Sequence, residues 1–548
     1  MNVNGTVVTT NLSFSAEFLA DFANVNISGL SGGPELVSGV PFNVDLFEGD
    51  NTIRLILSRG GQNTIYTLRV VRERLDVFAQ TAYVKASMPD ARDRFSTAVA
   101  IDGNTLVVGA PGEGSSSTEI NGDEANNNAG GSGAVYVFVR NLGIWTQEAY
   151  LKASNTDIGD GFGSSVAVFG DTLAVGAIRE ASSSTGVNGN QNINTLIRAG
   201  AVYVFTRNNG VWSQQAYIKA SNTDFDDQFG ASVDLYGDTL AVGAPLEDSN
   251  ASGVNGDDSN NELQNSGAVY IFNRDNDTWS QEAYLKASNS GQSDAFGSSI
   301  SLDEDRIAIG APLESSGSTG VNGDENSNSS LFSGAVYLFL RENEEWTQDT
   351  FFKASNTGQN DRFGSSVALS GNLLAVGAPF EDSDSIGVNG DQGDGEILVS
   401  GASGAAYVFS LLDGQWSQEA FVKASNTDAN NALGDNFGGA VALDGNMLVV
   451  GATGEDSFAT GIDGFQGNAG GRGEYGAAYG FTRSNEGWFQ QCYIKASNSR
   501  DLHEFGSSLA LQNGVLAVGS SNEDGVGSGV NGNQTSGRFG SGAVYVFD

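Results

Sequence analysis

The sequence has almost none of the side chains on which histidine- or cysteine-based catalysis depends. Its 548 residues include one Cys, Cys492, and one His, His503. A single Cys excludes an intrachain disulfide, and a single His leaves little for imidazole-based metal or nucleophile chemistry. Serine–histidine and cysteine–histidine hydrolases are therefore disfavoured. We interpret His503 as a solvated loop residue.

Basic residues are also scarce. Lys plus Arg is 26 against 66 for Asp plus Glu, which gives a formal net charge of -40. A surface of this sign repels phosphate backbones and anionic lipid headgroups, so we expect no nucleic-acid partner. The same acidity suits divalent cations, basic partners or a salty exterior. No run approaches the ~18 apolar residues that span a bilayer, so we expect no membrane insertion.

The composition favours a folded chain that is rich in turns. It contains 75 Gly and 7 Pro, and its 39% of hydrophobic residues includes 31 Phe. Such a chain can bury a large core. The first thirty residues lack a basic stretch followed by an apolar core, which an export signal would show. We expect a mature form or a fragment of an extracellular or cell-surface protein.

Residues 1–75 differ from everything that follows and read as short strands with alternating polarity. Residues 53–58 alternate, Gly60 and Gly61 supply a turn, and residues 66–70 form a second strand. The stretch LFEGDNTIRLIL followed by YTLRVVR resembles the C-terminal half of the cadherin-like β-sandwich domains of bacterial surface proteins. We therefore predict a small N-terminal β-sandwich over residues 1–75, which is short for a complete copy of such a domain.

The rest of the chain is a tandem repeat. The tripeptide Lys-Ala-Ser occurs seven times, at intervals of 67, 67, 67, 67, 70 and 72 residues. The tripeptides begin at Lys85, Lys152, Lys219, Lys286, Lys353, Lys423 and Lys495. An aromatic residue stands seven positions before each of these lysines, namely Phe78, Trp145, Trp212, Trp279, Trp346, Trp416 and Trp488.

Each unit reads as four strands. In the third unit, FGASVDLYGDTLAVGAP gives two strands around a turn at Gly237 and Asp238, SGAVYIFNR gives a third, and WSQEAYLKAS gives a fourth. Seven units of four antiparallel strands predict an all-β fold, a seven-bladed β-propeller over residues 76–548.

The two ends of the repeat region complement one another. The last unit has only three strands and finishes at Phe547 and Asp548, whereas an extra fourth strand, FAQTAYVKAS, precedes the first unit. We predict that this segment, residues 78–87, pairs with residues 544–547. The N-terminal strand would then close the ring and remove exposed sheet edges.

Two short motifs mark every unit. Phe-Gly precedes or opens the first strand of six units, beginning at Phe162, Phe229, Phe296, Phe363, Phe437 and Phe505. Gly-Ala-Pro ends the second strand of four units, beginning at Gly109, Gly243, Gly310 and Gly377. The units resemble the FG-GAP repeats of the integrin α-chain propeller and its bacterial relatives. This resemblance implies the propeller fold and favours an adhesion function.

Calcium binding does not transfer with the resemblance. Family members often carry a DxDxDG calcium loop between the first and second strands. Here that connection is a tight turn, such as Gly170 and Asp171, and no carboxylate cage fits in it.

A long loop follows the second strand of each unit, and we expect it to share one face of the ring with the connections between units. Loops held by a rigid scaffold commonly carry function, so this long-loop face is the candidate binding surface. A Glu stands eight positions before an Asn or Asp in every loop: Glu113 and Asn121, Glu180 and Asn188, Glu247 and Asn255, Glu314 and Asn322, Glu381 and Asn389, Glu455 and Asp463, Glu523 and Asn531.

These oxygen-bearing side chains have two interpretations. Next to a Gly that permits a sharp bend, they suit a calcium site. Alternatively, the Asn and Asp oxygens satisfy backbone N–H groups while the Glu accepts hydrogen bonds from the neighbouring blade. Recurrence in every unit favours this second, structural interpretation. We name no cofactor and keep calcium as the candidate ion.

Two loops are the best candidate metal sites, although neither has the spacing of an EF-hand. The fifth unit offers Glu381, Asp382, Asp384, Asn389 and Asp391, followed by Asp394 and Glu396. The third unit offers Glu247, Asp248, Asn255 and Asp257.

We call a set of residues that recur at the same position of each unit a column. Two further columns have a structural interpretation. An Asp stands two residues before the Phe of the first six units, and we predict that it caps a turn rather than binds a ligand. These residues are Asp93, Asp160, Asp227, Asp294, Asp361 and Asp435. We predict that the Trp column packs between blades rather than forming a sugar-binding platform.

Together these features favour a noncatalytic extracellular recognition or adhesion module that binds a protein or glycan through the long-loop face. It would act as a monomer or as part of a larger surface protein. Two alternatives remain open. One is a polysaccharide-acting enzyme with paired carboxylates near the channel mouth, and the other is a purely architectural domain.

Overall fold

A computed structural model describes residues 78–393, 403–427, 434–467 and 473–548, together with the backbone of five strands nearer the N-terminus. The chain divides into two compact units, Met1–Val77 and Phe78–Asp548. All regular structure in the described residues is β-strand, which confirms the all-β prediction. The described part of the chain has no helix with the length and apolar character needed to cross a membrane.

The first unit contains two small antiparallel sheets. Strand β1 (Asn11–Phe14) pairs with β3 (Phe42–Asp45). Strand β4 (Gly49–Arg59) pairs with both β2 (Asn24–Ser28) and β5 (Gln62–Arg72). The β4–β5 pair confirms the two strands of the predicted hairpin, while its turn lies outside the described residues. The cadherin-like assignment of this unit stays a prediction.

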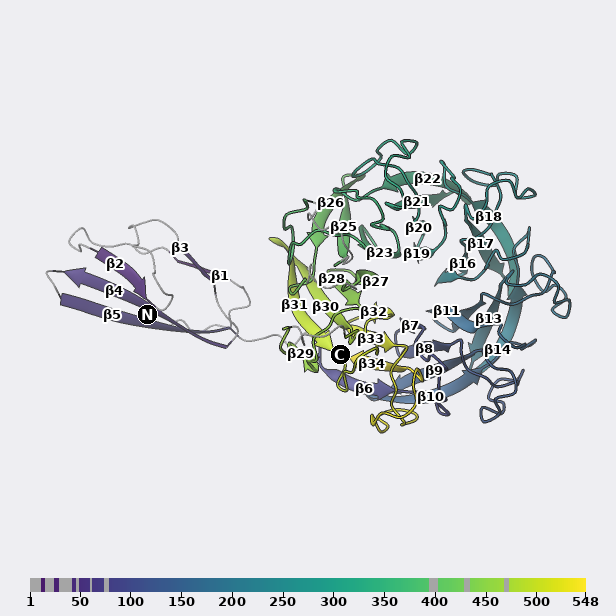
Figure 1. Ribbon diagram of the computed structural model, residues 1–548, viewed down its shortest axis with the longest axis horizontal. Helices are drawn as coiled ribbons and strands as arrows, with labels where there is room; N and C mark the ends of the chain where they lie inside the picture. Colours follow the sequence, from purple (N-terminus) through teal and green to yellow (C-terminus); the bar gives the residue numbers. More distant parts are fainter. Residues whose placement is uncertain are drawn as a thin grey trace. The chain divides into compact units, whose positions relative to one another are not determined.

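The second unit is a ring of seven blades, each a four-stranded antiparallel sheet (Figure 1). Blades 1 to 3 are β7 (Ala98–Asp102), β8 (Thr105–Ala110), β9 (Ala134–Asn141), β10 (Ile144–Leu151); β11 (Phe162–Phe169), β12 (Thr172–Ala177), β13 (Ala201–Asn208), β14 (Val211–Ile218); and β15 (Ser232–Tyr236), β16 (Thr239–Ala244), β17 (Ala268–Asp275), β18 (Thr278–Leu285).

Blades 4 and 5 are β19 (Ser299–Asp303), β20 (Arg306–Ala311), β21 (Ala335–Glu342), β22 (Glu345–Phe352); and β23 (Ser366–Ser370), β24 (Leu373–Ala378), β25 (Ala405–Leu412), β26 (Gln415–Val422). Blades 6 and 7 are β27 (Phe437–Asp444), β28 (Met447–Ala452), β30 (Ala477–Ser484), β31 (Gly487–Lys495), with the short β29 (Gly461–Ile462) added at the edge; and β32 (Leu509–Gln512), β33 (Val515–Ser520), β34 (Ala543–Phe547), β6 (Gln80–Val84).

The core lies between neighbouring blades. The first strands contact each other around the inside of the ring, from β7 through β11, β15, β19, β23 and β27 to β32 and back to β7. The second and third strands are almost wholly buried because both of their faces pack on neighbours. Trp212 of blade 2 is 4% exposed and joins a cluster with Val107 and Leu151 of blade 1. The prediction that the Trp column packs between blades is therefore confirmed.

The Phe-Gly and Gly-Ala-Pro motifs meet where two blades approach most closely. A Cβ atom on Gly243 would lie 2.2 Å from the carbonyl oxygen of Gly297 in the next blade. Gly297 itself has a φ of +90°, a conformation that other residues rarely adopt. The Ser232 hydroxyl donates to the same Gly297 carbonyl at 2.7 Å. Both glycines are thus required by contact between the blades.

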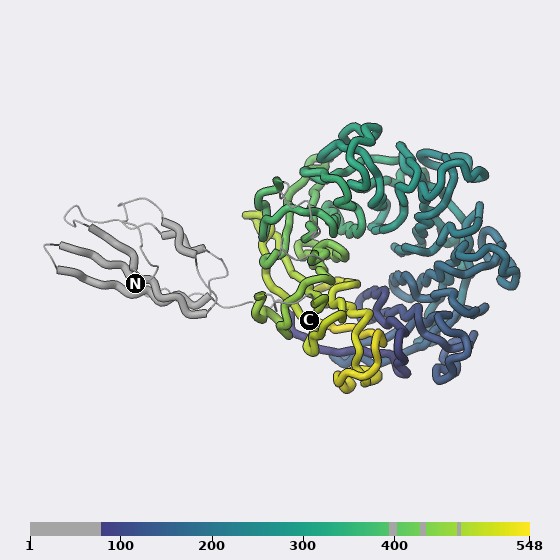
Figure 2. The backbone as a smooth tube through the Cα atoms, in the orientation of Figure 1, coloured from purple at the N-terminus to yellow at the C-terminus, as the bar shows by residue number. Residues whose placement is uncertain are grey.

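The ring is closed by β6 from the beginning of the propeller and β34 from its end, as predicted. Their register pairs Val84 with Val544 and Tyr83 with Tyr545. Figure 2 shows the purple start of this unit beside its yellow end. All four strands of blade 7 are therefore present, although they come from segments far apart in the sequence.

Candidate functional site

The two ends of each blade differ in what they expose. At one end the strands are joined by tight turns, such as residues 170–171 and 209–210 of blade 2. At the other end lie the long loops after the second strands and the connections between blades, which together form the long-loop face. Most of the large apolar side chains that remain exposed belong to this face: Met88, Ile158, Ile193, Ile197, Phe225, Leu331, Phe380, Ile386, Phe458, Phe465, Leu502 and Phe539.

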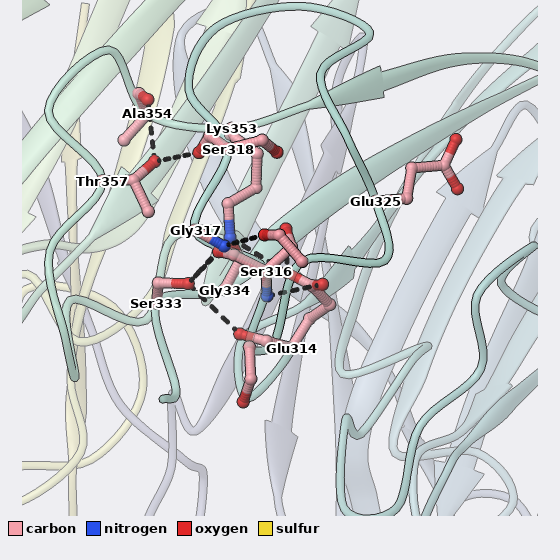
Figure 3. A network of polar contacts seen from close by, with 12 residues as sticks. Glu314, Ser316, Gly317, Ser318, Glu325, Ser333, Gly334, Lys353, Ala354 and Thr357 are labelled. Atoms are coloured by element: carbon pink, nitrogen blue, oxygen red, sulfur yellow. Dashed lines mark hydrogen bonds and ion pairs between the residues drawn. The ribbon is translucent and has the colours of Figure 1, made fainter. Parts of the chain in front are cut away.

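Each long loop is anchored by a buried ion pair, shown for blade 4 in Figure 3. Lys353, in the Lys-Ala-Ser segment after β22, donates to the carboxylate of Glu314 at 2.9 Å. Its remaining protons go to the Ser333 hydroxyl at 2.8 Å and the Gly334 carbonyl at 2.6 Å. The Ser316 amide donates to the other Glu314 oxygen at 2.8 Å. Burial lowers the pKa of Lys353, while the Glu314 carboxylate opposes that shift.

The same pair occurs in all seven blades. The lysine side chains are 0% exposed and the glutamate side chains 0–4%, with N···O distances of 2.5–3.0 Å. These seven lysines are all the lysines of the chain. In blade 7 the pair is Lys85 with Glu523, so it also joins the two ends of the ring. Sequence reasoning used the lysine as a repeat marker and missed this role.

The neighbouring blade supplies a further hydrogen-bond donor to the carboxylate of the glutamate. Asn222 follows the fourth strand of blade 2, and its amide donates to Glu247 of blade 3 at 2.9 Å. Its oxygen accepts a hydrogen bond from Tyr270. This arrangement recurs around the ring. The exception is the contact between blades 7 and 1, where the exposed Met88, after β6, stands at the Asn position. The structural interpretation of the Glu column is confirmed.

The Asn column covers the outer edge of each blade. Asn255 has a φ of +54°, its amide donates to the Tyr284 carbonyl at 2.7 Å, and its side-chain oxygen accepts from the Tyr284 amide at 2.9 Å. The same pairing is made by Asn121, Asn188, Asn322, Asn389, Asp463 and Asn531. A loop residue therefore satisfies strand groups that would otherwise form an open edge. The structural interpretation of this column is confirmed as well.

These partners account for several residues of the fifth-unit metal candidate. Glu381 pairs with Lys423 at 2.6 Å, and the Asn389 oxygen accepts from the Phe421 amide at 2.9 Å. Asp391 accepts from the amide of Gly393, two residues further on. Asp382 and Asp384 are exposed. Asp394 and Glu396 lie outside the described residues.

The third-unit candidate is used in the same way. Glu247 pairs with Lys286 at 2.8 Å, and Asn255 caps Tyr284. Asp248 accepts from the Asn265 amide at 2.6 Å, and Asp257 is exposed and accepts from Ser259. Within the described residues, no three His, Cys, Asp or Glu side chains are grouped as a metal site requires. Several of the candidate ligands thus bind groups of their own blade, and calcium binding at these loops stays a prediction.

The Asp column caps turns, as predicted. Asp227 is 2% exposed, and its carboxylate accepts from the Asp224 amide at 2.8 Å. Burial raises the pKa of Asp227 to about 8, and that hydrogen bond opposes the shift. Burial likewise raises the pKa of Asp93 to about 6 and that of Asp160 and Asp294 to about 7.

The interpretation of His503 as a solvated residue is wrong. His503 occupies the Asp position of the last blade and is 2% exposed. Its Nε2 lies 3.1 Å from Asp524, and burial lowers the pKa of the imidazole. The reason is that the turn keeps the same buried geometry in every blade, whichever residue occupies it.

Comparison with known proteins agrees with this architecture. The FG-GAP repeat family matches residues 78–138, 145–205, 212–272, 279–339, 346–409 and 416–479, which together are more than half of the chain. The chain therefore belongs to the FG-GAP repeat family. The seventh blade is shown by the strand pairing of β32, β33, β34 and β6.

Other comparisons say less. No curated protein matches the chain. Among solved structures, one from a study of two prolyl endopeptidases is similar at 10% identity and a TM-score of 0.31. The match covers 92% of this chain and 56% of that protein, so the chain spans little more than half of its length.

Proposed function

We propose that the chain is a noncatalytic recognition or adhesion module of the cell exterior, which binds a protein or glycan through the long-loop face. The observation that carries this proposal is the contrast within each long loop. Its base repeats the same buried Lys–Glu pair and the same cap at the Asn position in every blade. Its exposed apolar residues, by contrast, differ in type and position, as do Ile193 in blade 2, Leu331 in blade 4 and Phe465 in blade 6. Loops with a constant base and variable exposed residues are typical of binding surfaces held by a rigid scaffold. Membership of the FG-GAP family supports an extracellular setting.

The noncatalytic part of the proposal rests on how the buried acids are used. Catalytic acids commonly have perturbed pKa values. Here, however, the aspartates with clearly raised pKa values accept backbone hydrogen bonds in turns or strands, as Asp227 and Asp234 do. The buried glutamates are paired with lysine. These acids therefore act as structural groups.

Oriented immobilisation tests which face binds. Cys492 is buried, so one engineered Cys provides the accessible thiol. Val211→Cys lies at the tight-turn end of blade 2, where the native side chain is 68% exposed, and attachment there leaves the long-loop face free. Phe225→Cys lies on the long-loop face, where the native side chain is 59% exposed, and attachment there blocks that face. Each surface is then exposed to a panel of neutral and acidic oligosaccharides and of secreted proteins.

We expect ligands to be captured at least tenfold better by the Val211→Cys surface. Equal capture in both orientations would place binding elsewhere on the molecule. Absence of capture by folded Val211→Cys protein would favour the architectural alternative. Release of new reducing ends from a polysaccharide would favour the enzymatic one.

A further inference from the structure

One pocket on the long-loop face is lined by arginine. Its volume is about 520 Å³, and it spans parts of blades 1 to 3. Arg92 and Arg94 belong to the segment that leads into blade 1, and Arg179 follows β12 of blade 2. All three arginines are exposed. Three arginines thus line one pocket of a chain whose formal net charge is -40.

The repeat explains why there is room for these side chains. Arg92 and Arg94 occupy the positions where blade 2 has Gly159 and Gly161, and Arg179 occupies the position where blade 1 has Gly112. Gly112, Gly131 and Gly161 all line the pocket. Arginines of each of these two blades thus line the pocket together with glycines of the other. No other pair of adjacent blades has this combination in the described residues.

These arginines also differ from most of those at the opposite end of the blades. There, Arg207 pairs with Asp171 at 2.6 Å, Arg274 with Asp238 at 2.6 Å and Arg341 with Glu282 at 2.7 Å. Within the described residues, no ion pair joins Arg92, Arg94 or Arg179 to a carboxylate.

The carboxylates nearest to these arginines in the sequence accept hydrogen bonds from other groups. Asp93 is buried and accepts from the Asp90 amide at 2.5 Å. Asp160 accepts from the Asp157 amide at 2.9 Å. Arg94 opposes the burial that raises the pKa of Glu504, but no ion pair forms between the two. No carboxylate of the described residues therefore forms an ion pair that a ligand would have to displace from these arginines.

We propose that this pocket binds the anionic group, a carboxylate or a sulfate, of an acidic saccharide. This deepens the proposed function and rests on it. Guanidinium groups bind planar or tetrahedral oxyanions through paired N–H donors. A volume of 520 Å³ lies within the range of small-molecule sites, about 300–1,000 Å³.

The walls favour a sugar over an acidic peptide. The Thr97 and Ser164 hydroxyls donate to the carbonyls of Arg94 and Gly161 at 2.8 and 2.6 Å, so their oxygens remain acceptors for sugar hydroxyl groups. Pro111, Ile178 and Ala231 provide the modest apolar area on which the C–H face of a sugar ring packs.

The test is calorimetric titration of the full chain at fixed ionic strength with three tetrasaccharides: galacturonate, sulfated galactose and neutral galactose. We expect one or both acidic probes to bind, which identifies the anionic group, and the neutral probe to bind at least tenfold more weakly. Arg92→Gly/Arg94→Gly/Arg179→Leu should weaken acidic binding at least tenfold. Blade 2 already has Gly at the first two positions, and Leu246 and Leu313 occupy the third in blades 3 and 4, so the fold should tolerate these residues.

The matched control removes three arginines from the opposite end. Arg274→Leu/Arg306→Thr/Arg341→Leu makes the same change in net charge and uses residues found there in other blades, namely Leu411 and Thr239. Its binding should stay within twofold of the parent. An equal loss of acidic saccharide binding in both triple variants would mean that net charge alone explains the binding, and the proposal would be overturned.

Three other outcomes would also overturn it and leave the proposed function standing. In the first, the neutral probe binds as tightly as the acidic ones. In the second, a tetraglutamate peptide binds as tightly as galacturonate. In the third, no saccharide binds while the oriented surface captures a protein. Failure of every ligand on the oriented surface would instead remove the proposed function itself.

Discussion

The two ends of each blade use ion pairs of similar length in opposite settings. At the loop end, Lys286 and Glu247 lie 2.8 Å apart with 0% and 1% of their side chains exposed. At the turn end, Arg274 and Asp238 lie 2.6 Å apart with 17% and 61% exposed. A buried pair is costly to break because one charge is left without a partner in an apolar setting, whereas an exposed charge is solvated by water. The loop end is therefore rigid at its base, and the turn end tolerates change.

The largest expected effect is at the loop-end pair that also closes the ring. Lys85→Met leaves the Glu523 carboxylate buried without its ammonium partner. We expect the free energy of unfolding to fall by about 3–5 kcal/mol, measured by urea denaturation. Lys286→Met is the matched control within one contiguous blade. We expect the two losses to be similar in size and only Lys85→Met to make β6 accessible to protease.

A second substitution sharpens the Lys85 result. Adding Glu523→Leu to Lys85→Met removes the stranded carboxylate and should restore most of the lost stability. A loss below about 1 kcal/mol in Lys85→Met would mean that the buried pair behaves like an exposed one, and the comparison between the ends would fail.

The next effect is at the edge cap of the loop end. Asn255→Ala removes the acceptor of the Tyr284 amide and places Ala at a φ of +54°. We expect a loss of about 1–3 kcal/mol from the unpaired amide and the strained backbone, measured by thermal unfolding. Asn255→Asp keeps the oxygen, as Asp463 does in blade 6, and should retain most of the stability. Equal losses in both variants would mean that the side-chain oxygen does not matter.

A smaller effect concerns pH. The pKa of Asp227 is about 8 in the folded chain and about 3.9 in an unfolded one. The native state thus holds this proton more tightly. The resulting stability is fully present below pH ~3.9 and is lost as the pH rises through about 8. Asp227→Asn removes the titration while keeping an oxygen acceptor for Asp224, and at pH 9 it should be more stable than the parent by at least about 1.4 kcal/mol.

The pH comparison is made at constant ionic strength between pH 5 and 9, with unfolding followed by circular dichroism. The exposed turn-end substitution Asp238→Asn is the control and should keep the slope of the parent. If Asp227→Asn shows the same slope as the parent, ionisation of this buried turn does not contribute to stability.

The smallest expected effect is at the turn end. Arg274 pairs with the exposed Asp238, and its guanidinium lies 5.3 Å from the centre of the Trp279 ring. Arg274→Leu introduces the residue that blade 5 has at this position, Leu411. We expect a change below about 1 kcal/mol, which shrinks further in high salt. A loss as large as that of Lys286→Met would remove the distinction between the ends.

The repeat was sufficient to predict the propeller. Alternation within each unit indicated the strands, and the unmatched strand at 78–87 predicted the pairing of β6 with β34. The interface role of the Trp column and the turn-capping role of Asp227 were also predicted correctly, because each recurs at one place in the strand pattern.

The buried ion pair was the main feature that the sequence did not reveal. Lys-Ala-Ser and the loop Glu were recognised as separate columns, yet nothing local to either residue indicates the other. The missed signal was their constant separation, 39 residues in blades 1 to 4. The buried state of His503 was missed for a related reason, since burial there is set by the turn and not by the residue. The arginine pocket is formed by residues of blades 1 to 3 that are distant in the sequence.

The complete use of lysine inside the blades has a consequence for how the molecule meets reagents and enzymes. Every ε-amino group of the chain is 0% exposed and held by a carboxylate. The folded surface consequently offers no lysine to acylating dyes, to glycation by reducing sugars or to trypsin. Reaction of these amines would report unfolding of the blade to which each belongs, so the chain carries a natural probe of opening in every blade.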